Sequence, residues 1–256
     1  MPIIRQRIAD KPWFRIPKFV SKSKNAIIIG GGLSGTSIAF ALSQKGFNIT
    51  LIEREDRIAP GASGNPGGMF APLLTGDSSD LSEWSFAAYR EFSQFISLYR
   101  EQFPKILRQI GVYQIANLDE EMNRFKKAIE NSQISPGDVI LRENENFYRG
   151  IFFPKAGWAN PFELSNAYLR LSANRVKRIL STSVVQLERS ESYWKVFLSN
   201  KEILESEIVI FANSFDAKDF INGLEKIKKV RGQIVYYPSD KFPTKIENVI
   251  LHEDGY

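Results

Sequence analysis

Two glycine-rich segments lie close together near the start of this chain, and the first of them constrains the fold more than any other feature. Residues 30–35 read Gly-Gly-Gly-Leu-Ser-Gly; they follow the apolar run 26–29 and precede apolar residues at helical spacing. This order predicts a strand, a tight turn and a helix. In such a unit Gly30 turns the chain, Gly32 lets a diphosphate approach the backbone, and Gly35 allows the helix to pack on the strand. Because anions are favoured at a helix N-terminus, the segment predicts a site for a nucleotide with two phosphates.

A carboxylate follows at the spacing that a ribose contact requires. The second expected strand, 48–52, ends at Glu53, which lies 18 residues after Gly35. At that position a carboxylate can accept hydrogen bonds from a ribose diol. NAD, FAD and S-adenosylmethionine would all fit such a fold, so these residues alone leave the nucleotide open.

Composition narrows the chemistry that this chain can carry out. Its 256 residues, 43% of them hydrophobic, are enough for one large domain or two small ones with a buried core. There is no cysteine and only one histidine, His252, which excludes disulfides, zinc chemistry and a Ser-His-Asp triad. The sequence has no apolar stretch long enough to span a membrane and no apolar signal core near its N-terminus. We therefore expect a cytoplasmic protein that uses neither a membrane nor a metal.

The positive charge of the chain is concentrated in its first 24 residues. The whole chain carries a net charge of +5, but residues 1–24 contain seven basic residues against one acidic residue, so the remainder is close to neutral. This basic leader, with Trp13 and Phe14 inside it, could hold phosphates and stack on a base. A solvated linker is the simpler interpretation of such a charge run. Pro12 and Pro17 disfavour the amphipathic helix of a transit peptide.

Apolar spacing predicts a long helix after the second glycine-rich segment. Apolar residues recur there at intervals of three and four, and we expect this face, with its aromatic rings, to lie in the core. The face consists of Leu81, Trp84, Ala88, Phe92, Phe95, Tyr99 and Phe103. A short strand at 112–116 and a charged helix near 120–130 follow, as expected for a layer inserted into the nucleotide fold.

Strand patterns dominate the chain from Val176 onward. We expect strands at 183–188, 193–198 and 207–211, separated by turns rich in serine. The segment 208–211 is apolar throughout, which is typical of a parallel strand buried on both faces. We therefore expect it to rejoin the first sheet.

The order of these motifs resembles the D-amino-acid oxidase superfamily of FAD-dependent enzymes. The resemblance rests on residues 30–35, Glu53, the Gly-Ala-Ser-Gly loop at 61–64, the segment 182–184, and the apolar segment 208–211 with Ala212. More narrowly, the chain resembles the flavin domain of bifunctional enzymes that make 5-methylaminomethyl-2-thiouridine in tRNA. That narrower resemblance rests on residues 61–65, 71–74, 153–161, 231–233 and 254–256, and on residues 11–14, which resemble the connection from the methyltransferase to the flavin domain.

The resemblance implies an α/β fold, in which a Rossmann-like FAD-binding domain of the glutathione-reductase type carries an inserted α+β substrate domain. The implied ranges are a basic leader at 1–24, an FAD-binding domain at 25–90 and 175–230, and a substrate domain at 91–174 and 231–256. Family members continue past the segment matching 254–256, so we expect a chain that is incomplete at its C-terminus. An unpaired sheet edge would then make it marginally stable and prone to aggregate.

The resemblance also implies where the cofactor FAD would lie. The glycine turn would face the diphosphate, Glu53 the ribose, and Arg54 the adenosine. The further cofactor positions implied are Leu33 and Ser34 in the glycine turn, Ala62, Ser63, Gly67, Gly68 and Met69 where the loop would pass the isoalloxazine ring, Val184 at the adenine, and Ala212 after the late strand. Arg231 is a candidate contact for a substrate carboxylate, because a guanidinium suits that group. Plain turn chemistry for Ser63, a core position for Val184 and a surface position for Arg231 are the alternatives.

The activity implied is FAD-dependent removal of the carboxymethyl group from 5-carboxymethylaminomethyl-(2-thio)uridine at the wobble position of tRNA. The product would be 5-aminomethyl-(2-thio)uridine, on which a methyltransferase domain or protein would act next. No protein nucleophile is needed, because the cofactor carries the difficult step. Two alternatives stay open: an oxidase for glycine or another free amine, and an inactive, truncated fragment. Residues 212–214 read Ala-Asn-Ser, where the superfamily commonly has glycine in third place.

Overall fold

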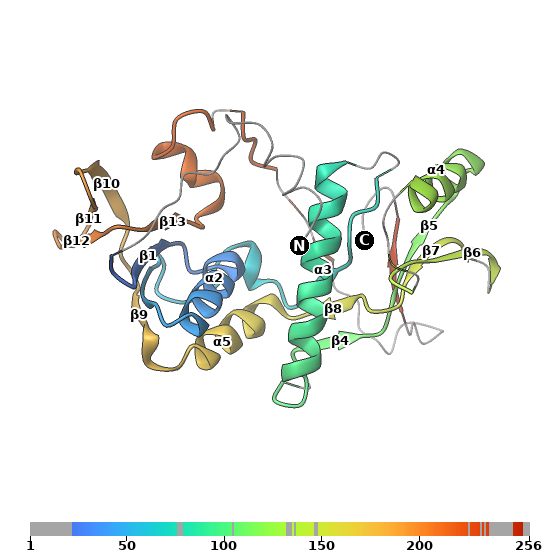
Figure 1. Cartoon of the computed structure of the whole chain (residues 1–256), viewed down its shortest axis with the longest axis horizontal. Helices are drawn as coiled ribbons and strands as arrows, with labels where there is room; N and C mark the ends of the chain where they lie inside the picture. Colours follow the sequence, from blue (N-terminus) through green and yellow to red (C-terminus); the bar gives the residue numbers. More distant parts are fainter. Residues whose placement is uncertain are drawn as a thin grey trace. The chain divides into compact units, whose positions relative to one another are not determined.

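The computed structural model describes residues 22–75, 79–103, 105–131, 135, 137–145, 148–224, 226–230, 232, 234–235 and 248–252. These residues form two compact units (Figure 1), and each unit is described by itself. The parallel-sheet unit contains the described residues of 22–66 and 160–235, and the mixed-sheet unit contains those of 67–159 and 248–252. Most of the basic leader, Arg231 and the segment 254–256 lie outside the described residues. The domain ranges given above stay a prediction.

The parallel-sheet unit contains short helices in its first part and a run of strands toward its end. Its elements are β1 (Asn25–Ile29), α2 (Leu33–Gln44), β2 (Asn48–Ile52), η2 (Ala62–Gly64), α5 (Pro161–Leu171), η3 (Ala173–Arg175), β9 (Val176–Ile179), β10 (Val184–Arg189), β11 (Trp194–Leu198), β12 (Ile203–Ser206), β13 (Val209–Phe211) and η4 (Ser214–Asp219). Four of the strands form a parallel sheet in the order β13-β1-β2-β9, and β10, β11 and β12 form an antiparallel meander. The expected α/β fold with a parallel sheet is therefore confirmed.

The two faces of the parallel sheet are covered by different elements. On one face Ile28 and Leu51, which are fully buried, pack with residues of α2 and α5. On the other face Ile27 and Ile52 pack with Val196 of the meander. Figure 1 shows α2 and α5 lying side by side, and the meander β10–β12 apart from them. Because both faces are covered, the near-continuous apolar runs of β1 and β2 satisfy the requirement of a buried parallel sheet.

The late apolar strand rejoins the first sheet, as expected, but it is not buried on both faces. β13 pairs in parallel with β1, so that Ile28 lies opposite Ile210. All three residues of β13 are only half-buried. The reason is its place at the end of the strand order, with β1 on one side of it. A strand with one neighbour keeps part of its surface exposed even when its sequence is entirely apolar.

The described residues of the mixed-sheet unit form one long helix, one shorter helix and two small sheets. Its elements are β3 (Gly68–Phe70), α3 (Asp80–Tyr99), β4 (Leu107–Gln109), β5 (Val112–Ile115), α4 (Asp119–Asn131), β6 (Ile140–Glu145), β7 (Tyr148–Phe153), β8 (Gly157–Ala159) and β14 (Val249–Leu251). The sheets have the orders β14-β5-β7-β6 and β3-β8-β4, and every pairing is antiparallel except that of β14 with β5. No helix among the described residues is long and apolar enough to cross a membrane.

The long helix α3 lies where the sequence predicts it, but the predicted core face is wrong. Leu81 and Trp84 are 63% and 66% exposed, whereas Phe86, Tyr89 and Ile96 are buried. Phe86 and Tyr89 belong to the apolar cluster around the sheet strands β5 and β7. Apolar residues line two overlapping faces of this helix, so spacing alone does not decide which face a sheet will cover. The expected ring at Phe103 lies beyond the end of the helix.

A buried ion-pair cluster joins three segments of the mixed-sheet unit. The carboxylate of Asp138, whose side chain is 5% exposed, accepts hydrogen bonds from Arg90 Nε at 2.9 Å and from Lys155 Nζ at 3.0 Å. Burial by itself raises the pKa of Asp138, but the hydrogen bonds and positive charges of Arg90 and Lys155 outweigh it. The pKa of this carboxyl is therefore held below its ordinary value.

We expect Asp138→Asn to lower the free energy of unfolding by about 1–3 kcal/mol at pH 7, because it removes a charged acceptor of two hydrogen bonds. A lowered pKa stabilises the folded state above the unfolded carboxyl's pKa, near 4, and that stabilisation is lost as the pH falls through the folded value. Urea unfolding of both proteins between pH 7 and pH 3 should show the difference shrinking toward the acid end. A difference that stays constant over that range would contradict the assignment.

Candidate functional site

The turn between β1 and α2 can be formed only with glycine at two positions. Gly30 has a φ of +109°, and a Cβ atom there would lie 2.5 Å from the carbonyl oxygen of Ala212. A Cβ atom on Gly35, in the first turn of α2, would lie 1.9 Å from the carbonyl oxygen of Gly30. The first turn of α2 therefore packs directly on the end of β1. This contact aims the N-terminus of α2 at the carboxyl edge of the sheet.

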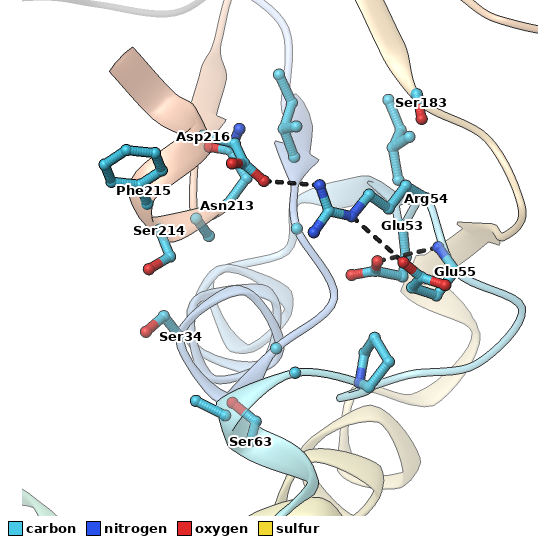
Figure 2. Close-up of a pocket in the computed structure, with 18 of the residues that line it drawn as sticks. Ser34, Glu53, Arg54, Glu55, Ser63, Ser183, Asn213, Ser214, Phe215 and Asp216 are labelled. Carbon is cyan, nitrogen blue, oxygen red and sulfur yellow. Dashed lines mark hydrogen bonds and ion pairs between the residues drawn. The ribbon is translucent and has the colours of Figure 1, made fainter. Parts of the chain in front are cut away.

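The N-terminus of α2 keeps amide groups directed at that edge. Its N-cap residue, Gly32, provides no side-chain cap, and the first turn has no acidic residue. The amide of Leu33 donates to Ser63 Oγ at 2.9 Å, so the loop containing η2 is tied to the start of the helix. Exposed amides and the positive end of the helix dipole together favour a bound anion. Ser34 follows on the same turn and also lines the cavity (Figure 2).

Glu53 is a buried carboxylate at the end of β2. It is 8% exposed, and its oxygens accept hydrogen bonds from the amide of Gly31 at 2.7 Å and the amide of Glu55 at 3.1 Å. The side chain therefore fixes the glycine turn from the neighbouring strand. An ionised carboxylate offers about four acceptor positions. Two of them remain for a ligand hydroxyl, so the structural contacts and a ribose contact are compatible.

Arg54 reaches across the edge of the sheet to a different loop. Its Nη1 lies 2.7 Å from Asp216 Oδ2 and its Nε lies 3.4 Å from Glu55 Oε1. Figure 2 shows the guanidinium between these two carboxylates. Because the side chain is well exposed, this pair contributes little to stability. Its effect is to hold the guanidinium plane at the mouth of the site.

A cavity of about 1610 Å³ opens at this edge, above the ends of β1, β2 and β13. Its volume exceeds the ~300–1,000 Å³ typical of sites for drug-sized ligands. Crevices beyond the carboxyl ends of parallel strands are where α/β sheets bind nucleotides. The predicted residues that line it are Gly30, Gly32, Leu33, Ser34, Glu53, Arg54, Ala62, Ser63, Val184 and Ala212. Gly35 lies behind them, between helix and strand.

Sequence reasoning missed a second wall of the cavity. Asn213, Ser214, Phe215 and Asp216 follow β13, and Lys228 and Lys229 lie further along the chain; all six line the cavity (Figure 2 labels the first four). The first four could have been found, because a strand that rejoins the sheet beside β1 must end at the same edge. No local pattern marks the two lysines. Asn213 Oδ1 is buried without a hydrogen-bond partner among the described residues, so the wall offers an acceptor to a ligand.

Three of the predicted cofactor residues, Gly67, Gly68 and Met69, do not line this cavity. Gly67, Gly68 and Met69 belong to the mixed-sheet unit, where Gly68 and Met69 are in β3 and pair with β8. Arg231 lies outside the described residues. Among the residues that the structure describes, no group of three or more His, Cys, Asp or Glu side chains is placed to hold a metal ion.

Comparison with known proteins agrees with this geometry. A family model described as FAD dependent oxidoreductase matches residues 25–255. The chain is 30% identical over 252 residues to the tRNA 5-methylaminomethyl-2-thiouridine biosynthesis bifunctional protein MnmC of Burkholderia mallei (strain SAVP1), covering 93% of this chain and 38% of that protein. The chain thus spans well under half the length of this relative.

Solved structures share the fold. L-proline dehydrogenase from P. horikoshii superposes with a TM-score of 0.65 at 21% identity, over 82% of this chain and 58% of that one. Glycine oxidase from Bacillus cereus ATCC 14579 superposes with a TM-score of 0.60 at 24% identity, over 76% and 56%. The family match covers nearly the whole chain and includes both units. The glycine turn and Glu53 follow one another in the expected order, and both line the cavity at the edge of the sheet. This chain belongs to the family of FAD-dependent oxidoreductases.

Proposed function

We propose that the cavity at the carboxyl edge of the parallel sheet binds FAD, and that the chain is the flavin-binding part of an enzyme that oxidises an amine. The observation that carries the proposal is the convergence of three features on one cavity. They are the tight turn that requires Gly30, the N-terminus of α2, whose first turn has no acidic residue, and the buried carboxylate of Glu53. The turn lets a phosphate approach the backbone, the helix N-terminus favours the negative charge of that phosphate, and the carboxylate can accept hydrogen bonds from a ribose.

Each side of the cavity has a proposed role. The N-terminus of α2, at Gly32, Leu33 and Ser34, lies against the diphosphate, Glu53 binds the ribose, and Arg54 lies beside the adenosine together with Val184. The loop residues proposed to approach the isoalloxazine ring are Ala62, Ser63, Gly67, Gly68 and Met69. Ala212 supports the glycine turn, since its amide donates to the carbonyl of Ile29 at 2.8 Å. Arg231 remains the proposed contact for a substrate carboxylate.

The proposed substrate is a carboxymethylaminomethyl group on the wobble uridine of tRNA. The name of the 30% identical relative and the narrower set of shared segments support this choice over a free amino acid. Bound FAD supplies a two-electron oxidation of the carbon beside the amine nitrogen, so that water can release the two-carbon group as an oxo acid. A reaction on tRNA would take place in the cytoplasm, and a methyltransferase would act on the aminomethyl product.

We expect Lys228→Gln with Lys229→Gln to weaken FAD binding about fivefold to tenfold, because two positive charges at the cavity would no longer face the diphosphate. The measurement is a titration followed by flavin fluorescence. Competition by ADP should weaken by a similar factor, and competition by adenosine should stay unchanged. Lys201→Gln with Lys226→Gln is the matched control, since neither residue lines the cavity. Equal losses for ADP and adenosine would indicate a local folding defect and contradict the role in phosphate binding.

We expect the FAD-loaded chain to convert carboxymethylaminomethyluridine in tRNA to aminomethyluridine, with release of one two-carbon oxo acid per uridine. Mass spectrometry of nucleosides and assay of the acid measure this. Glycine in place of tRNA tests the alternative oxidase and should give no peroxide. Turnover of glycine but not of tRNA would reject the tRNA substrate, and bound FAD without turnover of either would support an inactive fragment.

A further inference from the structure

One carboxylate at the cavity opposes the anion that the cavity is proposed to bind. Asp216 lies in η4, shortly after β13, and lines the cavity together with the start of α2. A negative charge at this position repels a bound diphosphate, so by itself it weakens the proposed site. The contacts of Asp216 indicate a different task for this charge.

Those contacts show no task for Asp216 in folding. η4 has no side-chain hydrogen bond at its N-cap. Within the described part of the chain, the carboxylate of Asp216 accepts one hydrogen bond, from Arg54 Nη1 at 2.7 Å. The two side chains are 39% and 61% exposed, so water screens the ion pair and it contributes little to stability. The stability of the fold therefore does not account for this carboxylate.

The backbone on either side of Arg54 is fixed without the ion pair. The carbonyl of Glu53 accepts a hydrogen bond from the amide of Thr182 at 3.1 Å, and the carbonyl of Glu55 accepts one from the amide of Ser181 at 2.8 Å. These contacts leave open the direction of the arginine side chain, which has many rotamers in solution. The ion pair fixes that direction.

The ion pair carries the side chain of Arg54 across the end of the central strand β1. Arg54 follows β2 and Asp216 follows β13, and β1 lies between these two strands in the sheet. Figure 2 shows the guanidinium directed at the carboxylate of Asp216. On the other side, Arg54 Nε lies 3.4 Å from Glu55 Oε1. Because the N–H groups of a guanidinium lie in its plane, two carboxylates at its edge leave the faces of the plane open.

An open guanidinium face suits a flat aromatic ring. A guanidinium stacks on such rings through cation–π attraction and contact between the planes. Several other cations of the described residues lie over aromatic side chains, but Arg54 does not. It lines the cavity, as does Val184, which is proposed to lie at the adenine. The adenine ring of FAD is therefore a suitable partner for this face.

We propose that Asp216 is a positioning residue for the adenosine half of FAD: through its ion pair it holds the Arg54 guanidinium as the platform on which adenine stacks. The identification of the ligand as FAD rests on the proposed function. Asp216 itself does not touch the cofactor. The adenine contact offsets the repulsion between this carboxylate and the diphosphate, and the site selects FAD over FMN, which lacks adenosine.

The test compares ligands with and without adenosine on the full chain. FAD and FMN are titrated by flavin fluorescence, and ADP and adenosine compete with FAD. Asp216→Asn should weaken FAD, ADP and adenosine about twofold to fivefold, the loss expected for an exposed cation–π contact, and should not weaken FMN. Adenosine separates the two effects of the substitution, because an uncharged ligand does not respond to the loss of a negative charge.

Asp219→Asn is the matched charge control. It removes a carboxylate from the same short helix and the same wall of the cavity, but Asp219 pairs with Lys218 at 3.4 Å and not with Arg54. Competition by adenosine should stay at the parent value in this variant, and binding of ADP should not weaken. An equal loss of adenosine binding in both variants would assign the effect to the charge or folding of η4 and overturn the proposal.

A double-mutant cycle shows whether Asp216 acts through Arg54. Arg54→Gln should weaken adenosine binding at least as much as Asp216→Asn, and the two substitutions together should cause no further loss. Additive losses would overturn the proposal. Unchanged adenosine binding in Asp216→Asn, with a parent that binds FAD, would also overturn it and leave the proposed function standing. The expected binding pattern in a chain that oxidises no amine would support the role of Asp216 and reject the proposed function.

Discussion

The close contact between Gly35 in α2 and the carbonyl of Gly30 at the end of β1 determines how the rest of the parallel-sheet unit is arranged. It leaves no room for a side chain, so the helix begins directly above the strand end. Backbone hydrogen bonds extend the sheet past that point: Gly30 N donates to Ile52 O at 2.8 Å, and Ala212 N donates to Ile29 O at 2.8 Å. Loops from three strands therefore meet around one helix terminus. The cavity is a consequence of that meeting.

Glu53 links this backbone geometry to the charge of the site. A buried carboxylate needs hydrogen-bond donors, and the amides of Gly31 and Glu55 supply them. The same group therefore holds the glycine turn in shape and presents acceptors to the cavity. A glutamine there would keep the volume of the side chain but would offer a single acceptor oxygen to two amides. The residue that is proposed to bind ribose is thus also needed to build the site that receives it.

Local patterns in the sequence were sufficient to predict the glycine turn, its two strands and the position of Glu53, because these features depend on residues close together in the chain. The return of β13 to the sheet was also predictable, from its apolar composition. The buried face of α3 was not, because rings on two sides of that helix compete for one sheet, and only the position of β5 and β7 decides between them. Lys228 and Lys229 were likewise missed, since they lie outside any helix or strand and no local pattern indicates which edge of the sheet they reach.

The segment 153–161, which carries much of the narrower resemblance, has architectural tasks in the structure. Phe153 is fully buried in the core of the mixed-sheet unit, and Lys155 pairs with the buried Asp138. Asn160 caps α5 by accepting from the amide of Glu163 at 3.0 Å, with Pro161 at the first helical position. These residues end one unit and start a helix of the other. The segment therefore has a structural task whichever substrate the chain acts on, since it completes the core of one unit and begins a helix of the other.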